Sequence, residues 1–358
     1  MAFPRLLAAT MVALAAAAGA GCGDGGSRGG SDAGTDTDAG TDADSDSDSD
    51  ATDAGTDAGT DTGTDTDCAW SFAVAQASAT ALFDIHGAGE DEILAVGGAS
   101  FFFDGSAWSE VSLPYEVGLY GVWYLGGAGD TRAVAVGIHG DTLRFDGTAW
   151  NDEPGNSCEH DLYGVYAANP TTWYAVSGWL LDGIFPQGEL LAWNDALGDW
   201  DAPLAITEEE LRGIWGWSAG ELKVVGGGGV IAGWYGSLSM ETIPGLTDHL
   251  LSVHGCSPTD IWAVGSSGKV VHSTDGSSWS EVVAPTTSSL LDVWCFASDA
   301  VFVGSVDGAL LIYDGVEWQL LDTGYPEPVR GVYAASDTQV YLVTDSGASS
   351  KIISGTCE

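Results

Sequence analysis

A unit of about 40 residues recurs seven times between residue 68 and the C-terminus, and it limits the possible folds more than any other feature. An apolar segment of each unit carries one recurring valine. It falls at Val96, Val136, Val176, Val225, Val264, Val303 and Val343, in steps of 40, 40, 49, 39, 39 and 40 residues. One unit of four short apolar segments cannot bury both faces of a small sheet. Successive copies must therefore pack on one another.

This period predicts an all-β fold, a seven-bladed β-propeller with four strands in each blade. The first strands are expected to begin at Leu82, Leu119, Leu162, Leu211, Leu250, Leu290 and Val329. The turn between the third and fourth strands reads Asp-Gly in four blades and precedes Trp108, Trp150, Trp279 and Trp318. Glycine supplies the positive φ that such a short hairpin requires, and the Trp is expected to cover the outer edge of its blade.

The two ends of the repeat region predict how the ring closes. The last unit stops at its third strand, residues 351–355, and the missing fourth strand matches residues 68–74. The N-terminal strand should therefore complete the last blade and leave no long open edge. This alignment places Cys68 and Cys357 in one turn, where we expect a disulfide. Cys256 and Cys295 occupy nearly matching positions in neighbouring blades and form a second expected pair.

The first 21 residues predict a secretory signal. One basic residue, Arg5, precedes an apolar run that is too short to span a membrane. The segment ends in Gly-Ala-Gly before Cys22, which resembles the bacterial lipobox, although Gly19 stands where that pattern usually has an aliphatic residue. The resemblance implies a lipid on Cys22. Ordinary cleavage nearby, with Cys22 incidental, is the alternative.

Residues 22–67 are expected to form a disordered tether behind the lipidated Cys22. Residues 23–67 contain 14 Asp against one Arg, and the only apolar side chains are those of Ala. Such a segment cannot bury apolar surface, and its like charges keep it extended. Its Asp-x-Asp-x-Asp spacing is similar to that of calcium loops. The glycine kink and the bidentate acid of those loops are missing, which favours a spacer.

The charge of the chain excludes one class of partner. The formal net charge is −43, and residues 68–358 hold 38 acidic against 7 basic side chains. A surface this acidic repels phosphate backbones, so nucleic acid is not expected as a partner. This acidic surface suits a cation-rich medium outside the cell or a basic partner. Solubility alone is the competing explanation.

Two groups of aromatic and apolar residues are candidates for ligand contact. The first strands carry one aromatic residue or His in each blade, namely His86, Trp123, Tyr166, Trp215, His254, Trp294 and Tyr333. This ring could line one mouth of the central channel and stack on sugars or cations, but packing between blades is the preferred interpretation. Blade 3 is longer than the others. Its insertion at residues 178–186 carries Trp179, Leu180, Leu181, Ile184 and Phe185.

Apolar side chains in a predicted surface loop either meet a partner or fold back on the blade.

Arg212 and Arg330 are further ligand-binding candidates, because they hold equivalent positions in blades 4 and 7 and two guanidinium groups could meet one carboxylate. Ion pairs with the acidic surface are the simpler explanation for both. The sequence contains no catalytic or metal-binding motif that we recognise, and no cofactor is expected.

The repeat resembles a known group of propellers. Residues 253–265 read VHGCSPTDIWAVG, which is similar to the VWGSGPDDVWAVG repeats of secreted and lipoprotein β-propellers of myxobacteria. The resemblance implies the architecture rather than an activity. The turn at residues 273–279 is also similar to the Asp-box of sialidase-like propellers. Asp-boxes are structural. The alternative function is a glycan-acting enzyme of the sialidase-like or lyase class that uses carboxylates around the channel mouth.

The sequence predicts a monomeric propeller, anchored by lipid alone to the bacterial outer membrane or cell surface. We expect it to bind an envelope or extracellular protein, or a glycan. Two carboxylates about 5–9 Å apart at the channel mouth would favour the enzyme. A mouth filled by the aromatic ring would argue against it.

Overall fold

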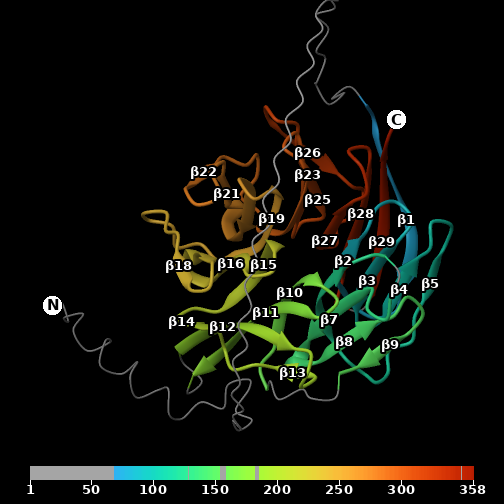
Figure 1. Cartoon of the computed structure of the whole chain (residues 1–358). Coiled ribbons are helices and arrows are strands. Elements are labelled where there is room, and N and C mark those ends of the chain that lie inside the picture. The colour runs from blue at the N-terminus through green and yellow to red at the C-terminus, as the bar shows by residue number, and fades with distance from the viewer. Residues whose placement is uncertain (1–67, 128, 154–158, 182–184, 348) are drawn as a thin grey trace, which may run out of the picture. The chain divides into compact units, whose positions relative to one another are not determined.

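The computed structural model describes residues 68–127, 129–153, 159–181, 185–347 and 349–358 (Figure 1). The predicted signal, Cys22 and the predicted tether lie outside the described residues. Helical structure in the described part is limited to three-residue turns, η1 (Ile138–Gly140), η2 (Gly227–Gly229) and η3 (Ser266–Gly268). None of the described residues belongs to a helix that could span a membrane.

The described strands form seven antiparallel sheets, one for each predicted repeat. Blades 1 and 2 contain β2 (Leu82–Gly87), β3 (Ile93–Gly97), β4 (Ser100–Phe103), β5 (Trp108–Glu110), β6 (Leu119–Tyr124), β7 (Ala133–Gly137), β8 (Thr142–Phe145) and β9 (Trp150–Asp152). Blades 3 and 4 contain β10 (Leu162–Asn169), β11 (Thr172–Leu181), β12 (Phe185–Asn194), β13 (Asp199–Trp200), β14 (Ala205–Thr207), β15 (Leu211–Ser218), β16 (Glu221–Gly226), β17 (Ile231–Trp234) and β18 (Leu238–Met240).

Blades 5 and 6 contain β19 (Leu250–Ser257), β20 (Asp260–Gly265), β21 (Val270–Ser273), β22 (Trp279–Val282), β23 (Leu290–Ala297), β24 (Ala300–Ser305), β25 (Ala309–Tyr313) and β26 (Trp318–Asp322). Blade 7 contains β27 (Val329–Ala334), β28 (Gln339–Asp345), β29 (Ser350–Cys357) and, from the other end of the propeller, β1 (Trp70–Ser78). The fold class is confirmed. The seven first strands begin at the residues that the repeat predicts.

The core lies between neighbouring blades. Every residue of β3 and of β7 is buried, because each sheet is covered on both faces. A strand buried on both faces reads as a continuous apolar run, which explains the recurring Ala-Val-Gly. The seven recurring valines all lie in second strands and are fully buried.

The ring closes as the sequence predicts. The strand β1 pairs antiparallel with β29, and Trp70 stands opposite Cys357. Figure 1 shows the two strands side by side, β1 in blue and β29 in red. Cys68 and Cys357 form a disulfide whose α-carbons are 5.4 Å apart. Cys256 and Cys295 form the second disulfide between blades 5 and 6, with α-carbons 5.0 Å apart.

The described part of the blade 3 insertion, residues 178–181 and 185–186, is paired strand and not the loop that we expected. It lengthens β11 and β12 into a hairpin of two ten-residue strands, in which Leu180 pairs with Pro186. The backbone of this segment is paired in the β11–β12 ladder, and Trp179 packs on His160 of the same blade. In a second insertion, residues 194–200, Leu197 is exposed and Trp200 packs inward. Trp200 is buried, and its Nε1 donates to Thr142 Oγ1 of blade 2 at 3.0 Å.

Candidate functional site

The first strands of the seven blades surround a central channel that contains a cavity of about 150 Å³. Three layers of side chains follow one another along these strands. The mouth layer is formed by the second residue of each strand, namely Phe83, Tyr120, Tyr163, Arg212, Leu251, Leu291 and Arg330. The polar layer, one residue further, holds Asp84, Ser252 and Asp292. The aromatic ring that the sequence predicts forms the third layer.

Three aromatic residues and one arginine make a continuous arc in the mouth layer. The rings of Phe83 and Tyr120 have centroids 5.5 Å apart, and those of Tyr120 and Tyr163 are 5.7 Å apart. The guanidinium of Arg212 lies 3.8 Å from the Tyr163 ring centroid and forms an ion pair with Glu210 at 2.7 Å. All four side chains are half-buried. We call these four residues the aromatic arc.

The blade 3 hairpin rises beside this arc. Gly178 of β11 lies so close to Tyr163 that an added Cβ would be 3.1 Å from its ring. The next residue, Trp179, stacks on His160 with ring centroids 4.2 Å apart, and Leu180 is 58% exposed. The start of the insertion therefore adjoins Tyr163 of the aromatic arc.

The remaining ligand-binding candidates from the sequence belong to the blade 3 insertion and to the channel mouth. Leu181 and Phe185 lie in the paired strands, but their side chains are not described, and Ile184 lies outside the described residues. Arg330 lines the same cavity from blade 7, and its Nε is 3.8 Å from Asp345 Oδ2. Arg212 and Arg330 thus border one mouth, and both have the acidic partners that the simpler explanation predicts.

Two carboxylates in the polar layer tie neighbouring blades together. The backbone N–H of Val122 donates to Asp84 Oδ2, and that of Val332 donates to Asp292 Oδ2, each at 2.8 Å. Ser252 Oγ donates to Asp292 Oδ1 at 2.6 Å. The inner edge of a first strand has no partner strand, so these side chains satisfy N–H groups that would otherwise be unpaired.

The channel shifts the pKa of its carboxylates and histidines in opposite directions. Burial raises the pKa of Asp292 to about 6, and burial with the nearby charge of Asp292 raises the pKa of Asp84 well above its usual range. Burial also lowers the pKa of His86 and His254 to about 3, so both are neutral at pH 7. In each case the low-dielectric surroundings disfavour the charged form.

The aromatic ring fills the channel beyond these carboxylates. His86 lies 4.3 Å from Trp123 and His254 lies 4.2 Å from Trp294, measured between ring centroids. Trp294 continues to Tyr333 at 4.8 Å. The two histidines also accept backbone N–H groups of the following blades through Nδ1. These contacts agree with the interpretation of the ring as packing between blades.

The sequence analysis did not single out Asp84 and Asp292. The third residue of the first strand is Gly in blades 2, 3, 4 and 7 but Asp or Ser in blades 1, 5 and 6. This departure from Gly was the sequence feature that could have identified them. The cavity of about 150 Å³ beside them is below the roughly 300–1,000 Å³ of small-molecule sites. With their hydrogen bonds to backbone N–H groups, these carboxylates fit a structural role better than glycoside chemistry.

Comparisons with known proteins agree on the architecture. No protein-family model matches the chain, and no curated protein matches its sequence. Ycf48 bound to a D1 peptide is 17% identical, with a TM-score of 0.62 over 80% of this chain and 96% of that chain. Ycf48 from Cyanidioschyzon merolae is 15% identical, with a TM-score of 0.58 over 80% of this chain and 98% of that chain.

The WD40 β-propeller domain of Doa1 is 10% identical, with a TM-score of 0.59 over 79% of this chain and 96% of that chain. Identities this low show the fold alone. The chain is a seven-bladed β-propeller that is structurally similar to Ycf48 and to WD40 propellers.

Proposed function

We propose that this protein is a binding propeller that captures an extended segment of another protein at its channel mouth. The aromatic arc is the observation that carries the proposal. Tyrosine and arginine dominate the binding energy of protein interfaces, and here they stand next to one another, half-buried. Ring stacking and the Arg212 contact already fix these side chains, so binding costs little conformational entropy.

The charge of the propeller favours a basic partner. Burial is the main cause of the raised pKa of Tyr120 and Tyr163, and the nearby charge of Asp161 adds to both shifts. The charge of Glu210 adds to the shift of Tyr163. Residues 68–358 carry 38 acidic and 7 basic side chains. Such a field attracts a cationic segment and speeds its encounter with the mouth. The solved Ycf48 structure, in which a propeller of similar fold holds a D1 peptide, supports a peptide as the kind of ligand.

A display experiment tests this proposal. Random twelve-residue peptides are selected on the immobilised full-length protein, and the same protein is applied to a glycan array. We expect selected peptides to be rich in Lys and Arg and to lose at least about tenfold in affinity when Tyr120→Ser and Tyr163→Ser are combined. Calorimetry on purified peptides measures the loss.

The matched control is Tyr235→Ser. Tyr235 is a solvent-accessible tyrosine, more exposed than the two of the arc, and it lies in the turn between β17 and β18, at the end of its blade opposite the mouth. Its substitution should leave peptide affinity unchanged. Selection of glycans alone, or peptides that bind the Tyr120 and Tyr163 variant with full affinity, would refute the proposal.

We also propose that the protein works at the cell envelope, held by a lipid on Cys22. The support is the lipobox-like end of the predicted signal and the resemblance of the repeats to myxobacterial lipoprotein propellers. Cells grown with labelled palmitate should label the wild-type protein and leave the Cys22→Ser variant unlabelled. Equal labelling of the two would reject the anchor.

A further inference from the structure

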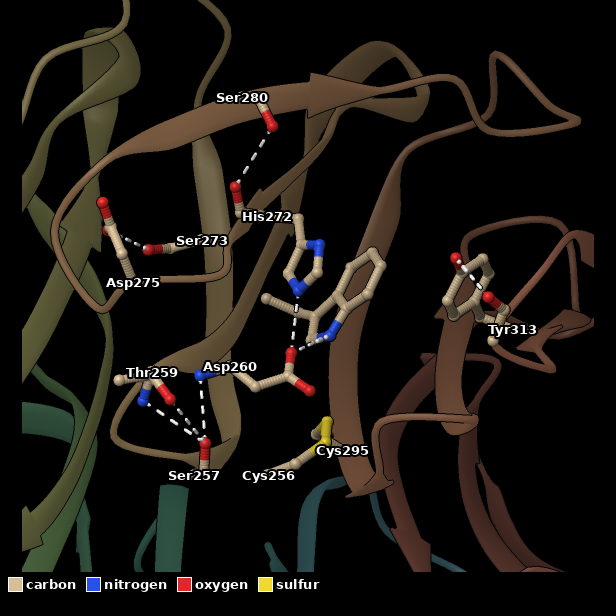
Figure 2. Close-up of polar contacts among 12 residues, drawn as sticks. Cys256, Ser257, Thr259, Asp260, His272, Ser273, Asp275, Ser280, Cys295 and Tyr313 are labelled. Carbon is tan, nitrogen blue, oxygen red and sulfur yellow. Dashed lines mark hydrogen bonds and ion pairs between the residues drawn. A yellow bond between two sulfur atoms is a disulfide. The ribbon is translucent and has the colours of Figure 1, made fainter. Parts of the chain in front are cut away.

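A group of metal-ligand atoms lies at the end of blades 5 and 6 opposite the mouth. Cys256 comes from the end of β19, Asp260 from the start of β20 and Cys295 from β23 of the next blade. The two Sγ atoms and a carboxylate oxygen of Asp260 all lie within 4.8 Å of one another. Figure 2 shows this group, with the disulfide beside the Asp260 carboxylate.

Both side-chain contacts of the Asp260 carboxylate are made by one of its two oxygens, Oδ1. Trp262 Nε1 donates to Oδ1 at 3.1 Å, and His272 Nε2 lies 2.7 Å from the same oxygen. The His272 and Trp262 rings stack with centroids 3.7 Å apart, which fixes both donors. Among the described residues no hydrogen bond reaches Oδ2, and Figure 2 shows this second oxygen turned toward the sulfurs.

In the structure the two sulfurs are bonded to each other and cannot bind a metal ion. Reduction by a phosphine breaks the S–S bond. The phosphorus is oxidised to the phosphine oxide with an oxygen atom from water, and the two protons of that water go to the sulfurs. Binding of a divalent cation then releases these two protons, because thiolate is the metal ligand.

The reduced group has donors that suit zinc. Zn²⁺ takes thiolate sulfur at about 2.3 Å and carboxylate oxygen at about 2.0–2.2 Å in tetrahedral geometry. Two thiolates on one such ion stand about 3.8 Å apart. The α-carbons of Cys256 and Cys295 are 5.0 Å apart, so side-chain rotation suffices to open this distance. A His hydrogen-bonded to a ligating carboxylate is the kind of supporting contact that orients metal ligands.

We propose that the reduced protein binds one Zn²⁺ through Cys256, Cys295 and Asp260, with His272 and Trp262 positioning the carboxylate. The fourth position on the ion is open to water. Zinc binding and the disulfide exclude each other, so the site reports the redox state of its surroundings. This site lies away from the aromatic arc and does not depend on the proposed binding function.

Metal titration of the full-length chain tests the proposal. The protein is reduced with a phosphine, desalted without oxygen and titrated with Zn²⁺ against a chelating dye, and separately with Co²⁺. We expect the reduced protein to bind one ion with a thiolate-to-cobalt charge-transfer band, and the oxidised protein to bind none. Near-UV circular dichroism checks that the reduced propeller keeps its packing.

Three variants locate the ion. Cys256→Ser should abolish the charge-transfer band, and Asp260→Asn should weaken zinc binding at least about tenfold. Cys68→Ser removes a thiol from the other disulfide and should leave the band unchanged. The proposal is wrong if reduced wild-type protein takes up no zinc at micromolar concentration, if it unfolds on reduction, or if Asp260→Asn binds as tightly as wild type.

Discussion

At the scale of single residues, the channel holds two carboxylates and two imidazoles with opposite pKa shifts from one cause. Burial raises the pKa of Asp84 and Asp292 and lowers that of His86 and His254. The carboxyl oxygens and the imidazole Nδ1 atoms accept backbone N–H groups of the following blades, and these hydrogen bonds join the inner strands. The opposite shifts have opposite effects on stability as pH changes.

The contribution of Asp292 can be isolated by Asp292→Asn. Its folded pKa of about 6 exceeds the unfolded value of about 4, so its stabilising effect is complete below about pH 4 and is lost as pH rises through about 6. The amide keeps an oxygen for the Val332 N–H and never ionises. Two pKa units correspond to about 2.7 kcal/mol, so we expect the variant to be about 2–3 kcal/mol more stable than wild type at pH 7 and nearly equal at pH 4.

Urea unfolding at pH 4, 5, 6 and 7 measures this difference. The exposed carboxylate of Glu110 in β5 provides the control, because Glu110→Gln removes one charge outside the channel. A loss of stability in Asp292→Asn that is the same at pH 4 and pH 7 would contradict the assigned pKa. The histidines act in the other direction. Their stabilising effect is present above about pH 6.5 and is lost as pH falls toward about 3.

At the scale of elements, the Asp-Gly turns join the third and fourth strands of four blades. The φ angles of Gly105, Gly147, Gly276 and Gly315 lie between 79° and 98°, as the sequence predicts. The structure adds the role of the preceding aspartate. In each turn its Oδ1 accepts the N–H groups two and three residues later, as in the bonds from Thr148 and Ala149 to Asp146 at 2.8 Å.

Substitution of Asp146 tests how much this capping stabilises a blade. The hydrogen bonds from Ala149 and Thr148 lower the pKa of Asp146 to about 2, so the carboxylate is ionised at pH 7. Asp146→Ala leaves two N–H groups without their acceptor and should cost about 1–2 kcal/mol. Asp146→Asn keeps an acceptor oxygen and should cost less than half of that. Thermal unfolding would contradict the assignment if both variants lost the same stability.

At the scale of the molecule, the ring is closed at one place, the seam, formed by the pairing of β1 with β29 and the Cys68–Cys357 disulfide. The last blade takes its outer strand from the N-terminal side of the propeller, and the Cys68–Cys357 disulfide joins strands 289 residues apart. The Cys256–Cys295 disulfide spans 39 residues and links two blades that are already neighbours in sequence. The unfolded chain gains more conformational freedom when the longer loop is released.

The two bridges should therefore differ in their contribution to stability. Cys68→Ala with Cys357→Ala is expected to cost up to about 5 kcal/mol, and Cys256→Ala with Cys295→Ala up to about 4 kcal/mol. Guanidinium unfolding of the two double variants at pH 7 gives the comparison. A seam variant as stable as wild type would mean that β1 holds the last blade without its disulfide.

The sequence alone determined the number of blades, the starts of the first strands, the closing strand and both cysteine pairs. Each of these follows from local patterns repeated at a fixed period, where every copy meets the same packing requirement. Only the tertiary structure showed that the blade 3 insertion is a paired hairpin beside Tyr163, and that Asp84 and Asp292 hydrogen-bond to neighbouring blades.

The aromatic arc and the group formed by Cys256, Asp260 and Cys295 became visible in the same way. Matching repeat positions predict the Cys256–Cys295 pair, but the stacking of the arc residues and the place of Asp260 beside the sulfurs depend on side-chain orientations that no spacing within one repeat records. Burial and contact between blades are properties of the closed ring, so they arise only when the repeats are assembled.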